Sequence, residues 1–459
     1  MISPDQLVPP VVTAPAEPSP GIPFGFGRSF FLAFLIGLLW AVPAWWAPVF
    51  LYGMLAWDLI VLGTWAWDLR RLPPPRALEI TRRWQAPADL AAESRVVLEL
   101  RNRSSVPVVV SVRDDLPAAL ADEPPLLRSP VPAGGASRLE YSVRPRERGD
   151  LRLRNVYLRY GGSWQLAERW GQASLPQTVR IYPSLDEAKR NVMYLIRSRQ
   201  TVMEKRVKRQ RGRGREFESL RDYRQGDEPR DICWTATARR GKPISKVYQV
   251  ERSQTVWLVL DAGRLLRARS GELSKLDYAA AAALSLAQVA LYSGDAVGLL
   301  AYGRRLQQRV PAGRGPGQMP ALLAALALVR GEEVEANHAV AAEALLTLQK
   351  PRSLVVWLSD LAEAATVPEV VENASRMARR HLVLLAVIGQ PEMRSLLARN
   401  PETAGEMYRY VAAQEIVHRR DLLLRGLRQQ GALAIETDPS RLSTALVNQY
   451  LEAKERGLL

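Results

Sequence analysis

Residues 29–68 read SFFLAFLIGLLWAVPAWWAPVFLYGMLAWDLIVLGTWAWD, and no residue in this stretch is charged before Asp58. One helix that crosses a membrane needs roughly 20 apolar residues. The stretch is about twice that length, so it predicts two short transmembrane helices rather than one.

Two prolines and a pair of tryptophans mark the centre of this stretch as a turn. Pro43 and Pro48 flank Trp45-Trp46. Proline ends helices, whereas tryptophan favours the headgroup region of a bilayer. We therefore expect a hairpin of two transmembrane helices, at about Phe30–Trp45 and Val49–Trp67, within residues 29–68.

The charges around the hairpin indicate its orientation. Arg28 is the only base in the Pro-rich tail of residues 1–28, and Arg70, Arg71 and Arg76 follow the second helix. Basic residues concentrate on the cytoplasmic side of membrane segments. The tail lacks the basic start and cleavage site of a secretory signal. We therefore expect a multi-pass protein of the inner membrane with its soluble domains in the cytoplasm.

One carboxylate interrupts the second predicted helix. A charged group at the centre of a bilayer costs about 2.5 to 3.5 kcal/mol on insertion scales. Asp58 is therefore either protonated or partnered inside a helix bundle, or it lies near an interface because the helix begins late. The sequence leaves both interpretations open.

The chain is basic, and much of its charge is clustered. It carries 63 Lys and Arg against 47 Asp and Glu, and residues 189–252 alone hold 19 bases and 8 acids, a net charge of 19 − 8 = +11. Clustered positive charge indicates nucleic acid or anionic lipid as a partner. Attachment to a membrane favours lipid, to which each surface base adds about 1 kcal/mol of attraction.

Short β-prone runs follow the hairpin. Pro73-Pro74-Pro75 makes a stiff exit from the membrane, and β-forming runs separated by Asn, Pro and Gly then recur across residues 76–182. Strands at that spacing predict a small antiparallel β-sandwich, for which we expect a spacer or docking role. The runs are Arg95–Leu100, Val106–Val112, Ser137–Val143 and Leu151–Tyr160.

Residues 183–253 combine a predicted basic helix, Leu185–Arg209, with the most unusual passage of the chain. From Glu216 to Trp234, acids and arginines interleave while large apolar residues recur between them. We expect this passage to pack with its charges paired internally. Trp234 and the single cysteine, Cys233, would then occupy core positions.

From residue 254 to 459, apolar strands alternate with helices. This alternation predicts a Rossmann-type α/β domain with a mainly parallel sheet covered on both faces. Asp261 and Asp360 each follow a strand, at the edge where such folds bind ligands. The expected strands are Val256–Leu260, Ala296–Tyr302, Ser353–Leu358, Leu382–Ile388 and Ala432–Ile435, and the expected helices are Asp277–Tyr292, Val367–Arg380, Glu406–Gln429 and Arg441–Lys454.

The motifs from residue 213 onward resemble the bacterial domain-of-unknown-function family fifty-eight, whose members carry a von Willebrand factor A-like domain. The A-like part of the resemblance rests on Leu260-Asp261, residues 294–299 and Leu358-Ser359-Asp360. The resemblance implies the A-like fold for residues 254–459. The family signature is visible at Arg215, Phe217, Leu220, Arg221, Tyr223, Gly226, Asp227, Arg230, Ile232, Trp234, Ala238, Arg239, Lys246 and Glu251.

The resemblance also implies a candidate metal site. Metal-binding A domains hold a divalent cation with an Asp-x-Ser-x-Ser loop, a Thr and a second Asp. Here Gly263 and Leu265 stand where the two serines would be, so Asp261 and Asp360 could hold Mg²⁺ only weakly, through water. Otherwise the aspartates cap strand-to-helix turns, or Asp261 pairs with Arg264 or with a partner's arginine in a metal-independent docking surface.

We expect an interaction protein rather than an enzyme. The resemblance implies an adaptor that works with a MoxR-type AAA+ ATPase, and with other von Willebrand factor A-domain membrane proteins, in envelope or protein-complex maturation. Residues 313–317 lack the Lys-Ser/Thr of a phosphate-binding loop, and His338, His381 and His418 have no ligand spacing. The alternative is a basic membrane protein that binds anionic lipid or nucleic acid.

Overall fold

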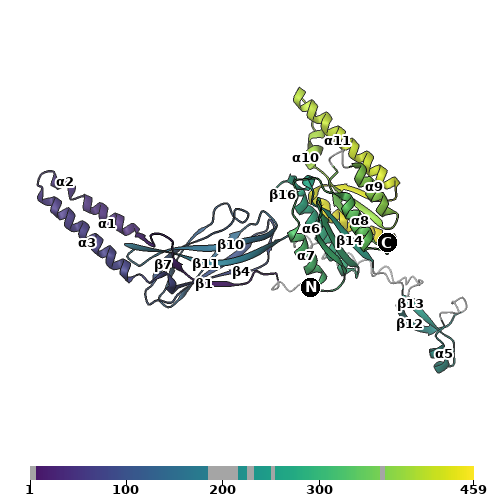
Figure 1. Ribbon diagram of the computed structural model, residues 1–459, viewed down its shortest axis with the longest axis horizontal. Coiled ribbons are helices and arrows are strands. Elements are labelled where there is room, and N and C mark those ends of the chain that lie inside the picture. The colour runs from purple at the N-terminus through teal and green to yellow at the C-terminus, as the bar shows by residue number, and fades with distance from the viewer. Residues whose placement is uncertain (1–6, 185–215, 225–231, 250–253, 362–366, 459) are drawn as a thin grey trace. The chain divides into compact units, whose positions relative to one another are not determined.

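The computed structural model describes residues 7–184, 216–224, 232–249, 254–361 and 367–458. The chain divides into two units (Figure 1). One unit comprises residues 1–184 with 271–273 and 323–330, and the other comprises residues 185–270, 274–322 and 331–459. An apolar helix near the N-terminus is followed by a sheet-rich region and then by an α/β region.

Three helices occupy the apolar stretch: α1 (Arg28–Leu38), α2 (Ala41–Ala44) and α3 (Val49–Arg71). The expected first helix is therefore divided after Leu38. Pro43 explains the break, because its ring removes the amide that would bond to the carbonyl four residues earlier. In the described part of the chain, α3 is the one helix long and apolar enough to cross a bilayer.

Glycines bring α1 close to α3. A Cβ built on Gly37 would lie 2.6 Å from Cδ1 of Trp57 and 2.9 Å from Oδ1 of Asp58. The indole nitrogen of Trp57 donates a hydrogen bond to the carbonyl of Ala33 at 2.8 Å. Since α3 begins at Val49, Asp58 lies inside the helix. The interpretation that α3 begins late is therefore wrong.

Two sheets form the β-domain. The first has the order β1 (Val12–Pro15), β4 (Leu78–Trp84), β6 (Ser94–Asn102) and β9 (Ala136–Val143). The second has the order β2 (Glu17–Pro18), β11 (Ala167–Tyr182), β10 (Gly149–Gly161), β7 (Val108–Asp114) and β8 (Leu126–Val131), and β3 (Phe24–Phe26) and β5 (Ala88–Asp89) also pair with β11. Side chains of alternating residues from both sheets share one core.

The N-terminal residues belong to this β-domain. β1 pairs with β4, and β2 and β3 pair with β11, so the expected Pro-rich tail of residues 1–28 contributes strands to both sheets. Proline is tolerated there because these strands lie at sheet edges, where fewer backbone donors are needed. The helices α1 to α3 are thus inserted between strands of one domain.

A buried ion pair crosses the core of the β-domain. Arg82 on β4 donates to both carboxylate oxygens of Asp114 on β7, and Tyr141 on β9 donates to the same carboxylate. Burial raises the pKa of the Tyr141 hydroxyl well above its usual value. Because the three residues come from both sheets, this network fixes one sheet against the other.

A small module stands between the two sheet regions in sequence. It contains β12 (Glu216–Asp222), α5 (Trp234–Arg240) and β13 (Ile244–Gln249), with β12 antiparallel to β13. Ile244 is buried, but Trp234 is 70% exposed and Cys233 is half-buried. The expectation that Trp234 is a core residue is therefore wrong, because most of its side chain is exposed at the start of α5.

The α/β region is built on one six-stranded sheet. Its order is β18 (Leu306–Gly313), β17 (Ala296–Tyr302), β14 (Thr255–Asp261), β19 (Leu354–Ser359), β20 (Leu382–Ile388) and β21 (Leu433–Thr437). All neighbours are parallel except β17 and β18. The four central strands are almost entirely apolar and buried, as expected of a sheet covered on both faces.

Helices cover both faces of this sheet (Figure 1). α6 (Lys275–Tyr292) and α12 (Leu442–Glu455) pack together on one face. On the other face, α8 (His338–Leu348), α9 (Val367–Ala378) and α11 (Ala404–Gln429) enclose a core around Trp257 and Trp357. The remaining elements are β15 (Arg269–Ser270), β16 (Leu273–Ser274), α7 (Gln318–Leu328) and α10 (Pro391–Leu397).

Candidate functional site

Both strand-end aspartates lie at the carboxyl edge of the six-stranded sheet. Asp261 is the last residue of β14, and Asp360 follows the adjacent parallel strand β19. Parallel pairing brings them to one edge, as expected from the sequence. Both are buried, with 4% and 2% of their surfaces exposed. They are therefore not open to direct contact with a partner.

A lysine ammonium occupies the position beside Asp360. Lys275 Nζ lies 2.5 Å from Asp360 Oδ2 and 3.4 Å from the carbonyl oxygen of Ile388, the last residue of β20. Lys275 is itself 2% exposed. Its positive charge compensates the buried carboxylate of Asp360.

The start of α6 positions this lysine. Ser274 and Asp277 form a capping box, in which each side chain bonds to the other residue's backbone amide. The box fixes Lys275 in the first turn of α6. A cation is disfavoured there by the helix dipole, so the Asp360 carboxylate supplies the compensating charge.

Further ion pairs extend the cluster along the sheet edge. Arg420 on α11 is buried, and its Nη1 donates to Glu436 on β21 at 2.9 Å. Its Nη2 lies 3.9 Å from Asp360 Oδ1, too far for a hydrogen bond. Arg394 on α10 lies 3.7 Å from Glu436. These contacts connect α10 and α11 to the carboxyl edge.

Neutral donors hold Asp261. Ser359 Oγ donates to Asp261 Oδ2 at 2.6 Å, and the amide of Gly263 donates to Oδ1 at 2.7 Å. The second bond has the pattern of a turn closed by an aspartate side chain. Burial raises the pKa of Asp261, and these two hydrogen bonds oppose the rise. Arg264, proposed from the sequence as a pairing partner, contacts Glu335 at 3.1 Å.

The residues at the expected serine positions do not fit a metal loop. A Cβ on Gly263 would lie 2.8 Å from the amide nitrogen of Ala336, so the backbone leaves no room there for a serine side chain. Leu265 is half-buried in a short 3₁₀ turn. Within the described residues, no three His, Cys, Asp or Glu side chains gather as metal ligands. The sequence motifs do not identify Lys275 as a residue of this site.

The three histidines lie in separate places. His338 Nδ1 is 2.9 Å from the hydroxyl of Tyr302, which also accepts a hydrogen bond from Trp357. His381 Nδ1 is 3.1 Å from Ser353 Oγ, and burial lowers the pKa of its imidazole. His418 is exposed on α11. The first two histidines are therefore buried residues, and Nε2 of His381 has no hydrogen-bond partner among the described residues.

The described signature residues gather in the β12–α5–β13 module. Leu220 is 43% exposed, and Tyr223 is joined through its amide to the carbonyl of Pro243 at 2.9 Å. Ile232 pairs with Ser245 of β13. Four further signature residues lie here: Arg221 on β12, Ala238 and Arg239 on α5 and Lys246 on β13. Phe217 is also on β12. Outside the described residues lie Arg215, Gly226, Asp227, Arg230, Glu251 and the expected helix Leu185–Arg209.

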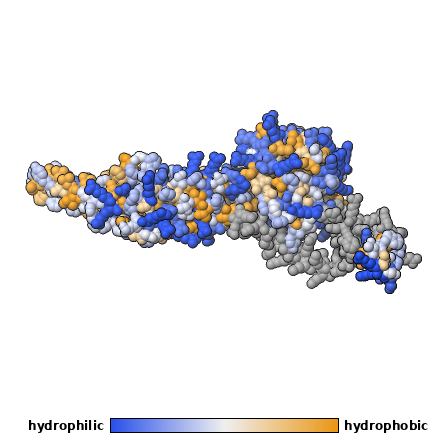
Figure 2. All heavy atoms as spheres, turned by 60° about the horizontal axis from the view of Figure 1, so that its bottom comes forward, coloured by the Kyte–Doolittle hydropathy of each residue, from blue (hydrophilic) through white to orange (hydrophobic). Residues whose placement is uncertain are grey.

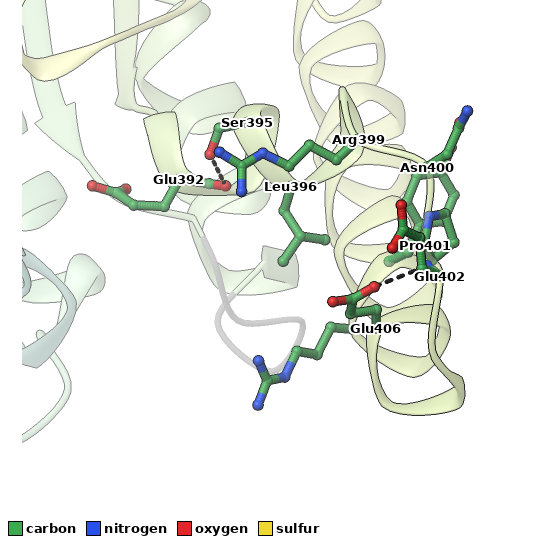
Figure 3. Close-up of a pocket in the computed structure, with 10 residues that line it drawn as sticks. Glu392, Ser395, Leu396, Arg399, Asn400, Pro401, Glu402 and Glu406 are labelled. Atoms are coloured by element: carbon green, nitrogen blue, oxygen red, sulfur yellow. Dashed lines mark hydrogen bonds between the residues drawn. The ribbon is translucent and has the colours of Figure 1, made fainter.

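A polar hollow lies between α10 and the N-terminal part of α11 (Figure 3). Glu406 there accepts the amide of Glu402 at 2.8 Å, and Ser395 donates to the carbonyl of Glu392 at 2.8 Å. The backbone bonds of Glu406 lower its pKa. These groups therefore stabilise helix ends, and they supply no nucleophile activated by a base.

Residues 219–402 match the model of the family described as Protein of unknown function DUF58. This stretch is similar to DUF58 domains. The match confirms the resemblance seen in the sequence, and the DUF58 stretch includes β14, β19 and both strand-end aspartates. No curated protein matches the chain significantly.

Two solved structures show weak likeness to this chain. The conserved hypothetical protein BatB from Bacteroides thetaiotaomicron is 12% identical, covering 44% of this chain and 100% of that one, with a TM-score of 0.30. Proximal thread matrix protein 1 from the mussel byssus is 11% identical, covering 43% and 46%, with a TM-score of 0.27. Likeness at this level carries no argument about fold or function.

Proposed function

We propose that this protein is a membrane-anchored adaptor whose von Willebrand factor A-like domain binds its partner without a metal ion. The observation that carries the proposal is the buried contact between Lys275 and Asp360. The internal ammonium compensates the buried carboxylate at the carboxyl edge. The domain would therefore hold its shape in the absence of any cation from solution.

The surface of the helices supports the membrane anchor. Most apolar residues of α3 are exposed, and Trp45 and Trp46 at the turn before it are 89% and 77% exposed. Figure 2 shows apolar side chains gathered at this end of the molecule. Such a surface is stable in lipid but not in water. A hairpin of α1 and α3 with Arg28, Arg70 and Arg71 at its base would place the soluble domains in the cytoplasm.

The free part of α11 is the surface we assign to the partner. The N-terminal half of α11 is almost wholly exposed, with Ala404, Met407, Tyr408 and Val411 spaced i, i+3, i+4 and i+7. This spacing places them on one apolar face. Arg420 connects the same helix to the ion cluster. The family resemblance favours a MoxR-type AAA+ ATPase as the protein that covers this face.

A retention experiment tests this function. The full chain, purified in detergent, is immobilised and a MoxR-type ATPase is passed over it with and without EDTA. We expect equal retention in both buffers and loss of retention for Tyr408→Asp. Leu422→Asp is the matched control, because Leu422 is 52% exposed on the same helix but lies about three turns beyond Val411. Equal retention of both variants, or release by EDTA, would contradict the proposal.

A second candidate function rests on the β12–α5–β13 module. Trp234 is exposed, and the exposed bases Arg239, Arg240 and Lys242 follow it within eight positions of the sequence. An exposed indole and bases in one short segment suit the headgroup region of an anionic bilayer. The module would then bind lipid in addition to the anchor, and nucleic acid is the competing ligand.

A further inference from the structure

The turn between β10 and β11, residues 162–166, is bonded to the base of both long N-terminal helices. The amide of Gly27 donates to the carbonyl of Leu166 at 2.8 Å, and the amide of Ser29, in the first turn of α1, donates to that of Gln165 at 3.3 Å. On the other side, Asp68 of α3 accepts the amide of Ala167 at 3.0 Å. The turn is therefore held by both helices.

Close backbone packing reinforces this attachment. A Cβ on Gly27 would lie 2.0 Å from the carbonyl oxygen of Gln165, so only glycine fits there. Asp68 is buried although it stands next to the exposed Trp67. The β-domain therefore contacts the helices through specific, closely packed hydrogen bonds at Gly27, Ser29 and Asp68, and we call this contact the seat.

Aromatic side chains surround this seat. Trp164 in the turn is 57% exposed, and its ring lies 5.5 Å from that of Trp67. Trp65 lies 4.9 Å from Phe26 and 6.0 Å from Phe24. The guanidinium of Arg71 stands 3.6 Å over the ring of Trp67. Aromatic rings next to arginines are typical of the bilayer headgroup level.

The length of α3 sets the depth of this aromatic ring. Trp65 follows Val49 by 16 positions, which corresponds to about 24 Å along a helix axis. Trp45-Trp46 lies at the opposite end, before α3 begins. A hydrocarbon core is roughly 30 Å thick. The two aromatic levels are therefore separated by roughly the thickness of the hydrocarbon core, and Trp164 belongs to the level at the β-domain.

We propose that the β10–β11 turn is a third membrane contact, in addition to α1 and α3, in which Trp164 lies among the headgroups of a glycerophospholipid bilayer. This inference rests on the proposed membrane anchor. The contact seats the β-domain directly on the bilayer surface, because the same turn is bonded to α1 and α3. The β-sandwich would then be held in contact with the bilayer surface, and it would not be a spacer connected only through the helices.

Spin labels at three positions test the inference in the full chain. Cys233→Ser removes the single native cysteine, and Trp164→Cys, Ile60→Cys and Leu126→Cys are labelled separately in phosphatidylethanolamine and phosphatidylglycerol vesicles. Ile60 is 60% exposed on α3, and Leu126 is 72% exposed on β8. Collision rates with lipid-soluble oxygen and with a water-soluble nickel chelate report the depth of each label.

The expected order of depth is Ile60 in the hydrocarbon, Trp164 at the headgroups and Leu126 in water. A label at Trp164 as accessible to nickel as the label at Leu126, with Ile60 still in lipid, would overturn the third contact alone. A label at Ile60 in water would overturn the membrane anchor itself. Gly27→Ala should shift the Trp164 label toward water while Ile60 stays in lipid, and an unchanged depth would show that the seat does not hold the turn.

Discussion

The two strand-end aspartates differ in what balances their charge. Asp360 contacts the ammonium of Lys275, whereas Asp261 is held by a hydroxyl and a backbone amide. Removing one partner of a buried ion pair leaves a charge without compensation, which costs about 3 to 5 kcal/mol. A carboxylate held by neutral donors loses much less when it becomes an amide.

Replacement by asparagine should therefore separate the two sites. Asp360→Asn should destabilise the α/β region by about 3 kcal/mol or more because Lys275 is left unpaired. Asp261→Asn should leave its stability at neutral pH unchanged or raised. Thermal unfolding of the two variants in parallel provides the measurement. Equal losses for both would mean that Asp261 also works as a required negative charge.

The pH dependence of Asp261 follows from the direction of its pKa. Burial raises the pKa in the folded state. Between the unfolded and the raised folded pKa, the native protein binds more protons, so its stability falls as the pH rises through that window. Any advantage of Asp261→Asn at neutral pH should therefore fade on acidification. A constant difference across this range would argue against a raised pKa.

Lys275 illustrates what residue-level reasoning missed. Asp261 and Asp360 could be placed at one edge from strand order alone, and the missing serines could be read directly. A lysine that begins a helix looks like a solvated side chain. A lysine in the first turn of a helix is unfavourable because of the helix dipole, and this is the one feature of the sequence that could have drawn attention to Lys275. Its partner, Asp360, can be identified only from the folded structure.

At the scale of elements, glycine decides how α1 meets α3. Gly37 faces Trp57 and Asp58 with no room for a side chain, and Gly53 faces Trp40, with a built Cβ 3.0 Å from its ring. Small residues allow helix backbones to approach closely in lipid. Gly63 on α3 has nothing within 4 Å of a built Cβ. The same residue type is therefore required at one position and free at another.

Gly37→Val should separate the helices, whereas Gly63→Val should not. Valine at Gly37 would overlap the ring of Trp57 and displace the indole from the carbonyl of Ala33. The readout is the yield of monodisperse membrane-extracted protein in size-exclusion chromatography. Comparable yields of both variants would show that the two helices do not need this contact.

The exposed position of Trp234 makes a second element-level prediction. Trp234→Ala should leave the thermal unfolding temperature unchanged, because the ring is exposed. It should weaken salt-dependent retention on anionic vesicles, because exposed bases follow Trp234 closely in the sequence. Trp357→Ala should destabilise by about 3 to 5 kcal/mol, since Trp357 is fully buried. Retention on DNA but not on vesicles would favour the nucleic-acid alternative, and unfolding of Trp234→Ala would restore the core interpretation.

The elements themselves were predictable where periodicity was strong. The expected strands Ala296–Tyr302 and Leu382–Ile388 coincide with β17 and β20, because buried parallel strands are continuous apolar runs. The sequence did not predict β18 or α8, because β18 mixes polar and apolar residues and α8 is only 11 residues long. The sequence did not predict the N-terminal strands, because proline usually argues against a strand and is tolerated only in edge strands such as β1.

At the scale of the whole molecule, each part carries a separate task. The N-terminal helices present an apolar surface, the β-domain holds their base, and the α/β region presents α11 from a sheet edge stabilised by ion pairs. Each task depends on contacts inside one part. We therefore expect a change of metal concentration to leave the proposed adaptor intact.

Calorimetric titration of the full chain in detergent with Mn²⁺ tests this account most directly. We predict no saturable binding to the wild type, because Lys275 already neutralises Asp360 and Gly263 leaves no place for a ligating hydroxyl. Asp360→Asn is titrated alongside as the control for the site. Saturable Mn²⁺ binding by the wild type that disappears in Asp360→Asn would contradict the account and show that the carboxyl edge is a working metal site.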